Sequence, residues 1–202
     1  DIKEQFIKNK VKDLNCIFYT HQHADQTHGI NDLRYFYLKN KIKIPVYANQ
    51  KTSKYLLASF KYCFKKTNNF YPPIMKLHKL NDNHSFLKNS INVKSFDVLH
   101  GNIKSICYVF NKKLAYASDV SFISKKDYPK LYNLKYFIID CLRENSHPSH
   151  YNLESVLNLI KEIKPKKTIL TNLSGSLDYD MLKKKLPKYV YPAYDGMKLI
   201  VN

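Results

Sequence analysis

The chain lacks any apolar run long enough to span a membrane, and it also lacks paired cysteines. Its four cysteines are scattered without a Cys-x-x-Cys pair: Cys16, Cys63, Cys107 and Cys141. This pattern is typical of buried free thiols in a reducing cytoplasm, where we expect the protein to reside. The first residues show no basic segment followed by an apolar stretch, so we expect no signal peptide. They also lack an initiator Met, so we expect a processed, trimmed or partial chain.

Arginine is scarce in this chain, although the chain is strongly basic. The formal net charge is +18, yet Arg34 and Arg143 are the only arginines among 34 basic residues. The lysines are spread along the chain and accompany much Asn, Ile, Tyr and Phe, as an AT-rich genome would dictate. We therefore favour a compositional origin of the charge over nucleic-acid binding, although the charge would help an anionic substrate to approach.

The two arginines adjoin candidate active-site segments. Arg34 ends the segment that begins at Gly29, and Arg143 follows Asp140. A guanidinium can bind a carboxylate or a phosphate through two parallel hydrogen bonds, which lysine cannot do. Two roles stay open: ion pairing that supports the neighbouring loops, which we favour, or direct contact with an anionic substrate.

The length and the hydrophobic content of 44% predict a single domain over residues 1–202 with a packed core. No repeat, linker or low-complexity segment interrupts it. Periodicity predicts helices over 2–11, 30–38, 52–64, 152–163 and 179–186. It predicts strands over 15–20, 44–48, 74–77, 91–99, 105–110, 113–118, 136–140, 167–171 and 197–201, with a hairpin turn at 111–112. Strands with interspersed helices predict a layered α/β protein.

The most informative segment is 21–29, which reads His-Gln-His-Ala-Asp-Gln-Thr-His-Gly directly after an apolar run. His21 and His23 alternate along the chain, so both imidazoles can reach one cation, and Asp25 is placed to reach a second. Neutral imidazole and carboxylate are ligands that Zn, Mn and Fe prefer. Solvated loop residues are the alternative, but only eight residues of the chain are His, so composition alone rarely produces this order.

Further donors follow other predicted strands. His100 ends one strand and Asp119 follows another, while the segment 140–150, which begins at the end of a third strand, holds Asp140, His147 and His150. Metal sites draw ligands from several strand ends, so these residues are candidate partners of the first segment. Each of them taken alone is more typical of a surface or capping residue than of a ligand.

The segment 21–29 resembles the HxHxDH signature of the metallo-β-lactamase superfamily, a group of metal-dependent hydrolases. Further segments, spread over the whole chain, are similar to its phosphoribosyl cyclic phosphate phosphodiesterase branch: Thr27–Arg34, Tyr71–Ile74, Asp140–Arg143, His147–His150, Leu170–Asn172 and Pro192–Gly196. The resemblance implies a four-layer αββα sandwich. It also implies one or two divalent ions, Zn or Mn with Fe as an alternative, and hydrolysis of a small phosphate ester by a metal-activated water.

The same resemblance implies roles for individual residues. His21, His23 and His100 would bind the first metal, Asp119 would bridge both metals, and Asp25 would belong to the second site. His150 matches the histidine that contacts the phosphate and can protonate the leaving oxygen, a task that suits His near neutral pH. The candidate catalytic residues are therefore Asp25, Asp119 and His150. The candidate substrate-binding residues are Arg34, Arg143, His147 and His150, with His147 either supporting His150 or merely lying in the loop.

Three departures from the family pattern concern the second metal and the front of the fold. Gln26 and Asn172 stand where the superfamily usually has His ligands of the second metal, and His28 lies too far along to replace them. An amide oxygen is a much weaker ligand, so we expect a well-filled first site and a weak second site. Family members also open with strands before the helix that begins here at Asp1, so we expect an N-terminally truncated fold with an unpaired sheet edge.

The leading interpretation is a metal-dependent phosphodiesterase that acts on a small cyclic or nucleotide-like phosphate. An RNA-processing nuclease of the same superfamily is the alternative enzyme, but the sequence has no inserted basic, Gly-rich arm for gripping tRNA. A degraded, non-catalytic metal- or ligand-binding homologue is the alternative outside enzymes, because Gln26 and Asn172 weaken the second site. We expect no membrane partner, we do not favour nucleic acid as a partner, and the sequence leaves a homodimer open.

Overall fold

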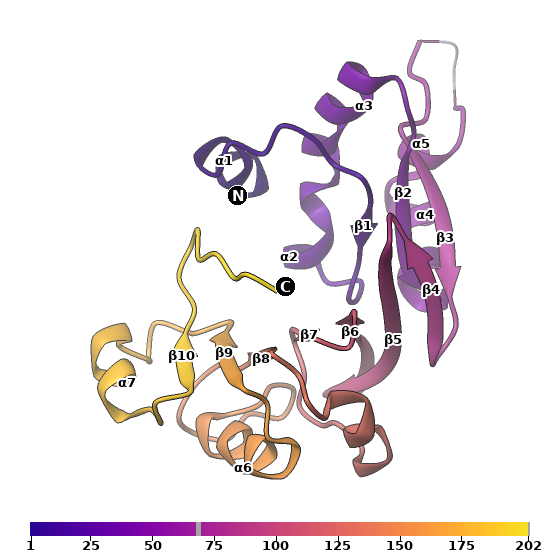
Figure 1. Cartoon of the computed structure of the whole chain (residues 1–202). Coiled ribbons are helices and arrows are strands. Elements are labelled where there is room, and N and C mark those ends of the chain that lie inside the picture. The colour runs from indigo at the N-terminus through magenta and orange to yellow at the C-terminus, as the bar shows by residue number, and fades with distance from the viewer. Residues whose placement is uncertain (68–69, 202) are drawn as a thin grey trace. The chain divides into compact units, whose positions relative to one another are not determined.

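The structure is a computed structural model, and it describes residues 1–67 and 70–201 (Figure 1). The chain folds into two compact units, residues 1–81 and residues 82–202, and each unit has its own sheet and its own hydrophobic core. The single domain expected from the length stays a prediction. No helix in the described part of the chain is both long enough and apolar enough to cross a membrane.

The first unit, residues 1–81, is built on a parallel sheet of three strands in the order β1-β2-β3. These strands are β1 (Ile17–Phe18), β2 (Ile44–Asn49) and β3 (Met75–Leu80). The other elements are α1 (Ile2–Lys8), α2 (Ala24–Thr27), the 3-10 helix η1 (His28–Leu33), α3 (Arg34–Asn40), α4 (Gln50–Ser59) and α5 (Lys61–Phe64). Alternate residues of β2 are buried, as expected for a strand with one core face.

The helices of the first unit differ from the prediction. α1 ends at Lys8, and the predicted helix 30–38 is the 3-10 helix η1 followed by α3. The predicted helix 52–64 is broken at Phe60, whose backbone leaves the helical region at φ −128° and ψ 37°. The Phe60 ring packs against the rings of His28 and Tyr55, with centroid distances of 5.5 and 6.4 Å. Packing of an aromatic side chain thus overrides the helical periodicity of the segment.

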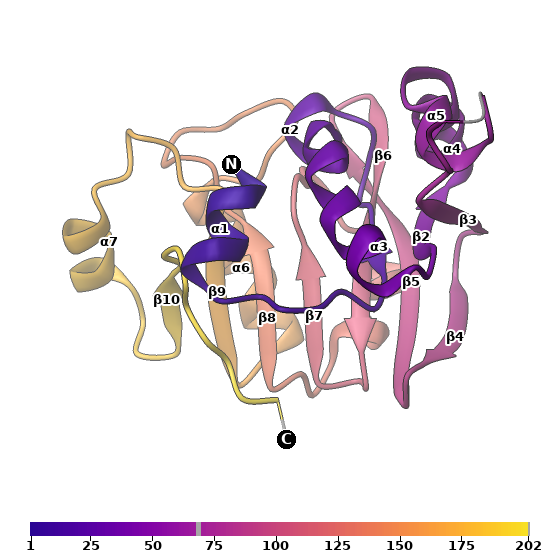
Figure 2. The same cartoon turned by 90° about the horizontal axis from the view of Figure 1, so that it is seen from above.

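The second unit, residues 82–202, contains a mixed sheet of seven strands in the order β10-β9-β8-β7-β6-β5-β4 (Figure 2). Its strands are β4 (His84–Lys88), β5 (Ile91–His100), β6 (Ile103–Phe110), β7 (Leu114–Ala117), β8 (Tyr136–Asp140), β9 (Lys167–Thr171) and β10 (Val190–Pro192). Strands β4 to β7 pair antiparallel, and β7 to β10 pair parallel.

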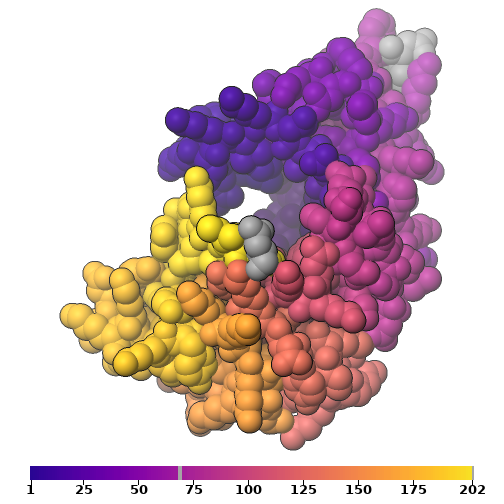
Figure 3. All heavy atoms as spheres, viewed as in Figure 1, coloured from indigo at the N-terminus to yellow at the C-terminus, as the bar shows by residue number. Residues whose placement is uncertain are grey.

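Helices complete the second unit: the 3-10 helix η2 (Lys125–Leu131), α6 (Leu153–Ile163) and α7 (Tyr179–Lys185). The apolar face of α6 belongs to the same core cluster as β8, with Ile160 and Phe137 almost fully buried. α7 lies at the surface of the unit (Figure 3). Its last three residues, all lysines, are exposed. The hydrophobic core of the unit therefore lies around the parallel strands and α6.

The predicted hairpin turn at 111–112 is confirmed. Asn111 and Lys112 have φ angles of 51° and 54°, and the backbone N–H of Lys113 donates to the carbonyl of Phe110 over 2.9 Å. Two consecutive positive φ angles match the right-handed twist of the flanking strands, which is why this turn type is common in two-residue hairpins.

The predicted final strand at 197–201 is wrong, because these residues are irregular. The last strand is instead β10, which the sequence did not reveal because it has only three residues and ends in Pro192. Strand β4 was also missed, since its residues alternate between half-buried and exposed without a buried apolar stripe.

Candidate metal centre

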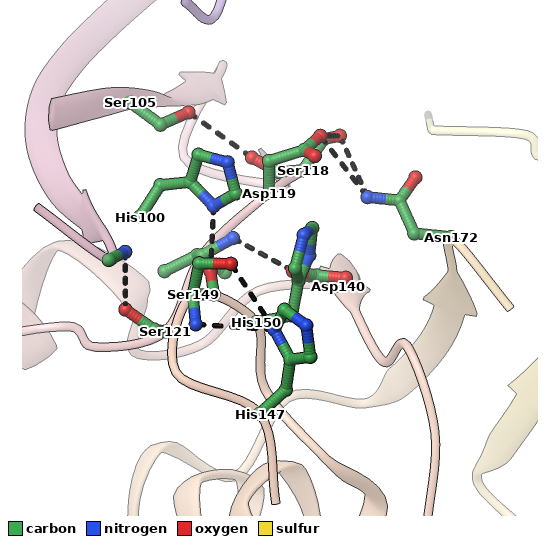
Figure 4. A network of polar contacts seen from close by, with 12 residues as sticks. His100, Ser105, Ser118, Asp119, Ser121, Asp140, His147, Ser149, His150 and Asn172 are labelled. Atoms are coloured by element: carbon green, nitrogen blue, oxygen red, sulfur yellow. Dashed lines mark hydrogen bonds and ion pairs between the residues drawn. The ribbon is translucent and has the colours of Figure 1, made fainter. Parts of the chain in front are cut away.

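Several candidate donors meet at one edge of the seven-stranded sheet. Strands β5, β7, β8 and β9 run in the same direction, because β5 and β7 are both antiparallel to β6, and β7, β8 and β9 pair parallel. Their carboxyl ends therefore lie at the same edge of the sheet. His100 ends β5, Asp119 follows β7, Asp140 ends β8 and Asn172 follows β9. Sequence order alone placed these residues at strand ends, and the topology brings them together (Figure 4).

His100, Asp119 and His150 form a group with the chemistry of a metal site. One ligand atom from each residue lies within 4.8 Å of the others. His100 and Asp119 are buried and His150 is half-buried, so the group is shielded but reachable. Two imidazole nitrogens and a carboxylate oxygen suit a divalent transition metal. These three residues therefore fit the divalent ion that the sequence implies.

Hydrogen bonds fix which ring nitrogen each of these histidines presents. His100 Nδ1 lies 2.6 Å from the carbonyl oxygen of Ser149, and His150 Nδ1 lies 2.7 Å from Asp140 Oδ2. A carbonyl oxygen only accepts hydrogen bonds, so Nδ1 of His100 carries the proton and donates; the Asp140 carboxylate likewise accepts from Nδ1 of His150. In the neutral form of both rings the lone pair is then on Nε2.

Asp140 is a fully buried acid; the sequence predicts it as a candidate donor but does not predict its contacts with Val120 and His150. Its Oδ2 also accepts the backbone N–H of Val120 over 2.9 Å. Burial, together with the charge of Asp119, raises the pKa of Asp140 to about 7, although the Val120 N–H, the Asn172 amide and His100 act in the opposite direction. Asp140 therefore holds His150 and the backbone after Asp119 in place from a single buried position. Its place at the end of an apolar strand was the signal that could have revealed it.

Asp119 has an unusual backbone and two side-chain donors. Its φ of 54° lies in the left-handed region, as does that of Asn172 at 58°. Ser118 Oγ donates to Asp119 Oδ2 over 2.5 Å, and Asn172 Nδ2 donates to the same oxygen over 3.2 Å. Asn172 thus contacts the candidate ligand Asp119 through its N–H group. Ser118 was missed because a single hydroxyl after a strand carries no recognisable signal.

A close backbone approach at Gly101 allows the His100 contact. Gly101 has a φ of 56°, and a Cβ atom at this position would lie 3.0 Å from the Cβ of Ser149. Only glycine adopts this conformation at no steric cost and leaves that space open. The glycine therefore lets the carbonyl of Ser149 reach the ring of His100.

The loop that carries His147 and His150 is held mainly by its own hydrogen bonds. Arg143 Nη2 donates to the carbonyl of Ser146 over 2.6 Å, so its guanidinium supports the loop. A direct contact between Arg143 and substrate stays a prediction. His147 Nδ1 accepts the backbone N–H of Ser149 over 3.2 Å, and its ring lies 5.0 Å from that of His150. His147 therefore contacts Ser149 and lies next to His150, which supports a role beside His150.

We predict that Asn152→Ala destabilises the second unit by about 1 kcal/mol, because the change removes a helix N-cap. Asn152 Oδ1 accepts the N–H of Ser155 over 3.1 Å, and its Nδ2 donates to the carbonyl of Glu144 over 2.9 Å. Denaturant titration followed by circular dichroism would measure the change. Asn158→Ala, at an interior position of the same helix, serves as the control; an equal effect there would contradict the capping role.

The first unit carries the histidine-rich segment. The rings of His21 and His23 lie edge to face with centroids 4.6 Å apart, His21 buried and His23 exposed. Burial acts to raise the pKa of Asp25, but the Gln26 amide, a backbone N–H and the two imidazoles lower it below its ordinary value. His28 is turned to Tyr55, with Nε2 2.9 Å from the hydroxyl, which agrees with its exclusion from the ligands.

Arg34 begins α3 in the first unit. Its charge lies close enough to the Cys63 thiol to oppose the rise in the pKa of that thiol, which burial dominates. No structural observation places Arg34 against a substrate, so its substrate-binding role stays a prediction. None of the four cysteines, all of which lie in the described part of the chain, is in a disulfide bond.

Comparison with known proteins decides the family. Residues 3–171 match the family model described as the beta-lactamase superfamily domain. The chain belongs to this superfamily. Its structure is similar to a crystal structure described as a new diphosphatase from the PhnP family, with 29% identity and a TM-score of 0.90 over 98% of this chain and 75% of that chain. The predicted α/β fold of the metallo-β-lactamase type is confirmed, and the similarity fits the predicted branch.

Other relatives are more distant or much longer. Human tRNase Z, short form, has a TM-score of 0.69 and 17% identity over 93% of this chain and 79% of that chain. A curated octanoyltransferase of Porphyromonas gingivalis (strain ATCC BAA-308 / W83) is 26% identical over 207 residues, which cover 100% of this chain and 41% of the relative. The chain thus spans well under half of that relative, and the tRNase Z likeness shows the fold alone.

Proposed function

We propose that the protein is a metal-dependent hydrolase of phosphodiesters, with a small cyclic or nucleotide-like phosphate as substrate. The grouping of His100, Asp119 and His150, whose ligand atoms lie within 4.8 Å of one another, is the observation that carries the proposal. Membership of a superfamily of hydrolytic metalloenzymes supports the metal dependence. Similarity to a diphosphatase of the PhnP family supports a phosphate ester as substrate.

The proposed metal ligands are assigned from the family pattern. His21, His23, His100 and Asp119 are the proposed ligands of the principal divalent ion, Zn or Mn. Asp25 is the proposed donor of a second position, where Gln26 and Asn172 replace imidazoles. Cytoplasmic location, and a small phosphate ester rather than nucleic acid as partner, belong to the same proposal.

Residues of this chain would perform the remaining chemistry. When bound, the ion polarises a phosphoryl oxygen and lowers the pKa of a coordinated water. His150 would contact the phosphate and donate a proton from Nε2 to the leaving oxygen in its imidazolium form. Asp140 would hold that ring in place and stabilise its positive charge through the 2.7 Å hydrogen bond at Nδ1.

A second candidate activity is hydrolysis of a diphosphate linkage. The name of the structural relative favours it, because that protein is described as a diphosphatase. Both reactions displace an oxygen leaving group from phosphorus, so the same residues would serve either one. Comparing bis(p-nitrophenyl) phosphate with ADP-ribose as substrates would separate the two activities.

Removal of metal is the direct test of the proposed function. Treatment with a chelator, followed by removal of the chelator, should reduce hydrolysis of both substrates to background, because the ion supplies charge stabilisation that no side chain replaces. Addition of Mn or Zn should restore hydrolysis in a concentration-dependent manner. Circular dichroism before and after treatment controls for unfolding. Full turnover by folded protein that metal analysis shows to be free of metal would refute the proposal.

A further inference from the structure

In each unit, one carboxylate among the candidate ligands is hydrogen-bonded by a carboxamide side chain. In the first unit, Gln26 Nε2 donates to Asp25 Oδ2 over 2.8 Å. In the second unit, Asn172 Nδ2 donates to Asp119 Oδ2 over 3.2 Å (Figure 4). Both residues stand at positions where the family pattern predicts an imidazole ligand. They present N–H groups, not lone pairs, toward the carboxylates.

These contacts disfavour a second cation at the same carboxylates. An amide NH2 group is only a donor, so it cannot act as a ligand in this orientation. At Asp119, the hydroxyl of Ser118 donates to the same Oδ2 atom over 2.5 Å. A carboxylate oxygen has about two lone-pair sites, and two donors fill them. Oδ2 of Asp119 is thereby engaged by the protein itself.

We propose that Gln26 and Asn172 are positioning residues that take the place of a second cation, so that the protein binds a single divalent ion. The inference rests on the proposed function, since it concerns the number of ions at the same centre. The positive ends of the two amide dipoles partly balance carboxylate charge that a second ion would otherwise neutralise. They also hold the carboxylates of Asp25 and Asp119 in fixed orientations.

Counting bound ions tests this proposal without relying on turnover. Protein saturated with Mn and passed through gel filtration should retain about one Mn per chain by elemental analysis. Its electron paramagnetic resonance spectrum should show isolated Mn without spin coupling. The Gln26→His/Asn172→His double variant should retain about two Mn per chain, with a coupled spectrum. In this variant, imidazoles that can bind a metal replace the amide N–H groups that donate to the carboxylates.

Asn83→His provides a matched control. Asn83 has a φ of 57°, close to the 58° of Asn172, and its Nδ2 donates to Asp82 Oδ2 over 3.2 Å. The control therefore has the same backbone strain and loses the same kind of hydrogen bond. It should keep the ion count of the wild type.

The outcomes separate this proposal from the proposed function. Two Mn per wild-type chain would overturn the single-ion proposal and leave the metal-dependent hydrolase standing. A folded double variant that still holds one Mn would also overturn the positioning role of the amides. A wild-type chain that holds no ion would overturn both proposals. If the double variant does not fold, the wild-type ion count and spectrum decide.

Discussion

Asp119→Asn is expected to reduce phosphodiester hydrolysis by roughly a thousandfold, because a metal ligand's charge supports stabilisation worth several kcal/mol in the transition state. The substitution keeps the shape of the side chain. The new residue, Asn, also tolerates the left-handed backbone found at this position, with φ 54°. Turnover of bis(p-nitrophenyl) phosphate at saturating Mn measures the effect. The metal content should fall in parallel.

The control for this prediction is another acid changed in the same way. Asp180→Asn, in the first turn of the surface helix α7, removes an equal charge from the second unit and should leave turnover unchanged. If Asp119→Asn retained full turnover, the hydrolysis would come from another site or from a contaminant. Equal melting temperatures of the two variants would show that lost activity does not reflect unfolding.

His150→Ala is expected to slow hydrolysis by roughly 10²–10⁴-fold when the leaving group is an alkoxide, because such an oxygen needs a proton as it departs. The loss should be much smaller for p-nitrophenolate, a weak base that leaves without protonation. The ratio of the two losses is the measurement, since a merely structural role of His150 would slow both substrates alike.

His84→Ala is the matched control for His150→Ala. His84 lies on the edge strand β4, where its ring packs near that of Phe86 with centroids 5.5 Å apart. Its removal should leave both rates unchanged. Equal loss on both substrates in His150→Ala would contradict proton donation and assign His150 to binding or folding instead.

The long, apolar strands of the second unit were predictable, and the missed ones have a common physical cause. β5, β6 and β8 were placed to within a few residues, because each is rich in buried apolar side chains. The two missed strands, β4 and β10, are the two edges of the sheet. β10 has only three residues, and β4 alternates between half-buried and exposed residues, so neither has the apolar run that reveals a central strand.

In the candidate site, too, some residues could be predicted from the sequence and others could not. His100 and Asp119 were predictable because each terminates or follows an apolar strand, where a polar residue stands out. Asp140 also ends an apolar strand, but its role depends on contacts with Val120 and His150, 20 and 10 residues away. Such contacts between distant segments follow from the strand order, which local periodicity does not determine. Ser118 could not be predicted for the same reason, because its role depends on its hydrogen bonds with Asp119 and Asn172.

The left-handed backbone at Asp119 and Asn172 has a consequence for how this protein can change. A residue with a Cβ atom is strained in that conformation, Asp and Asn less than most, and glycine would avoid the strain. Selection for thermal stability alone would therefore favour glycine at both positions. Glycine would remove the Asp119 carboxylate and the Asn172 amide. On the proposed function, activity therefore opposes stability at these two positions. Random mutagenesis with selection for higher thermal stability would be expected to inactivate the protein first at Asp119 and Asn172.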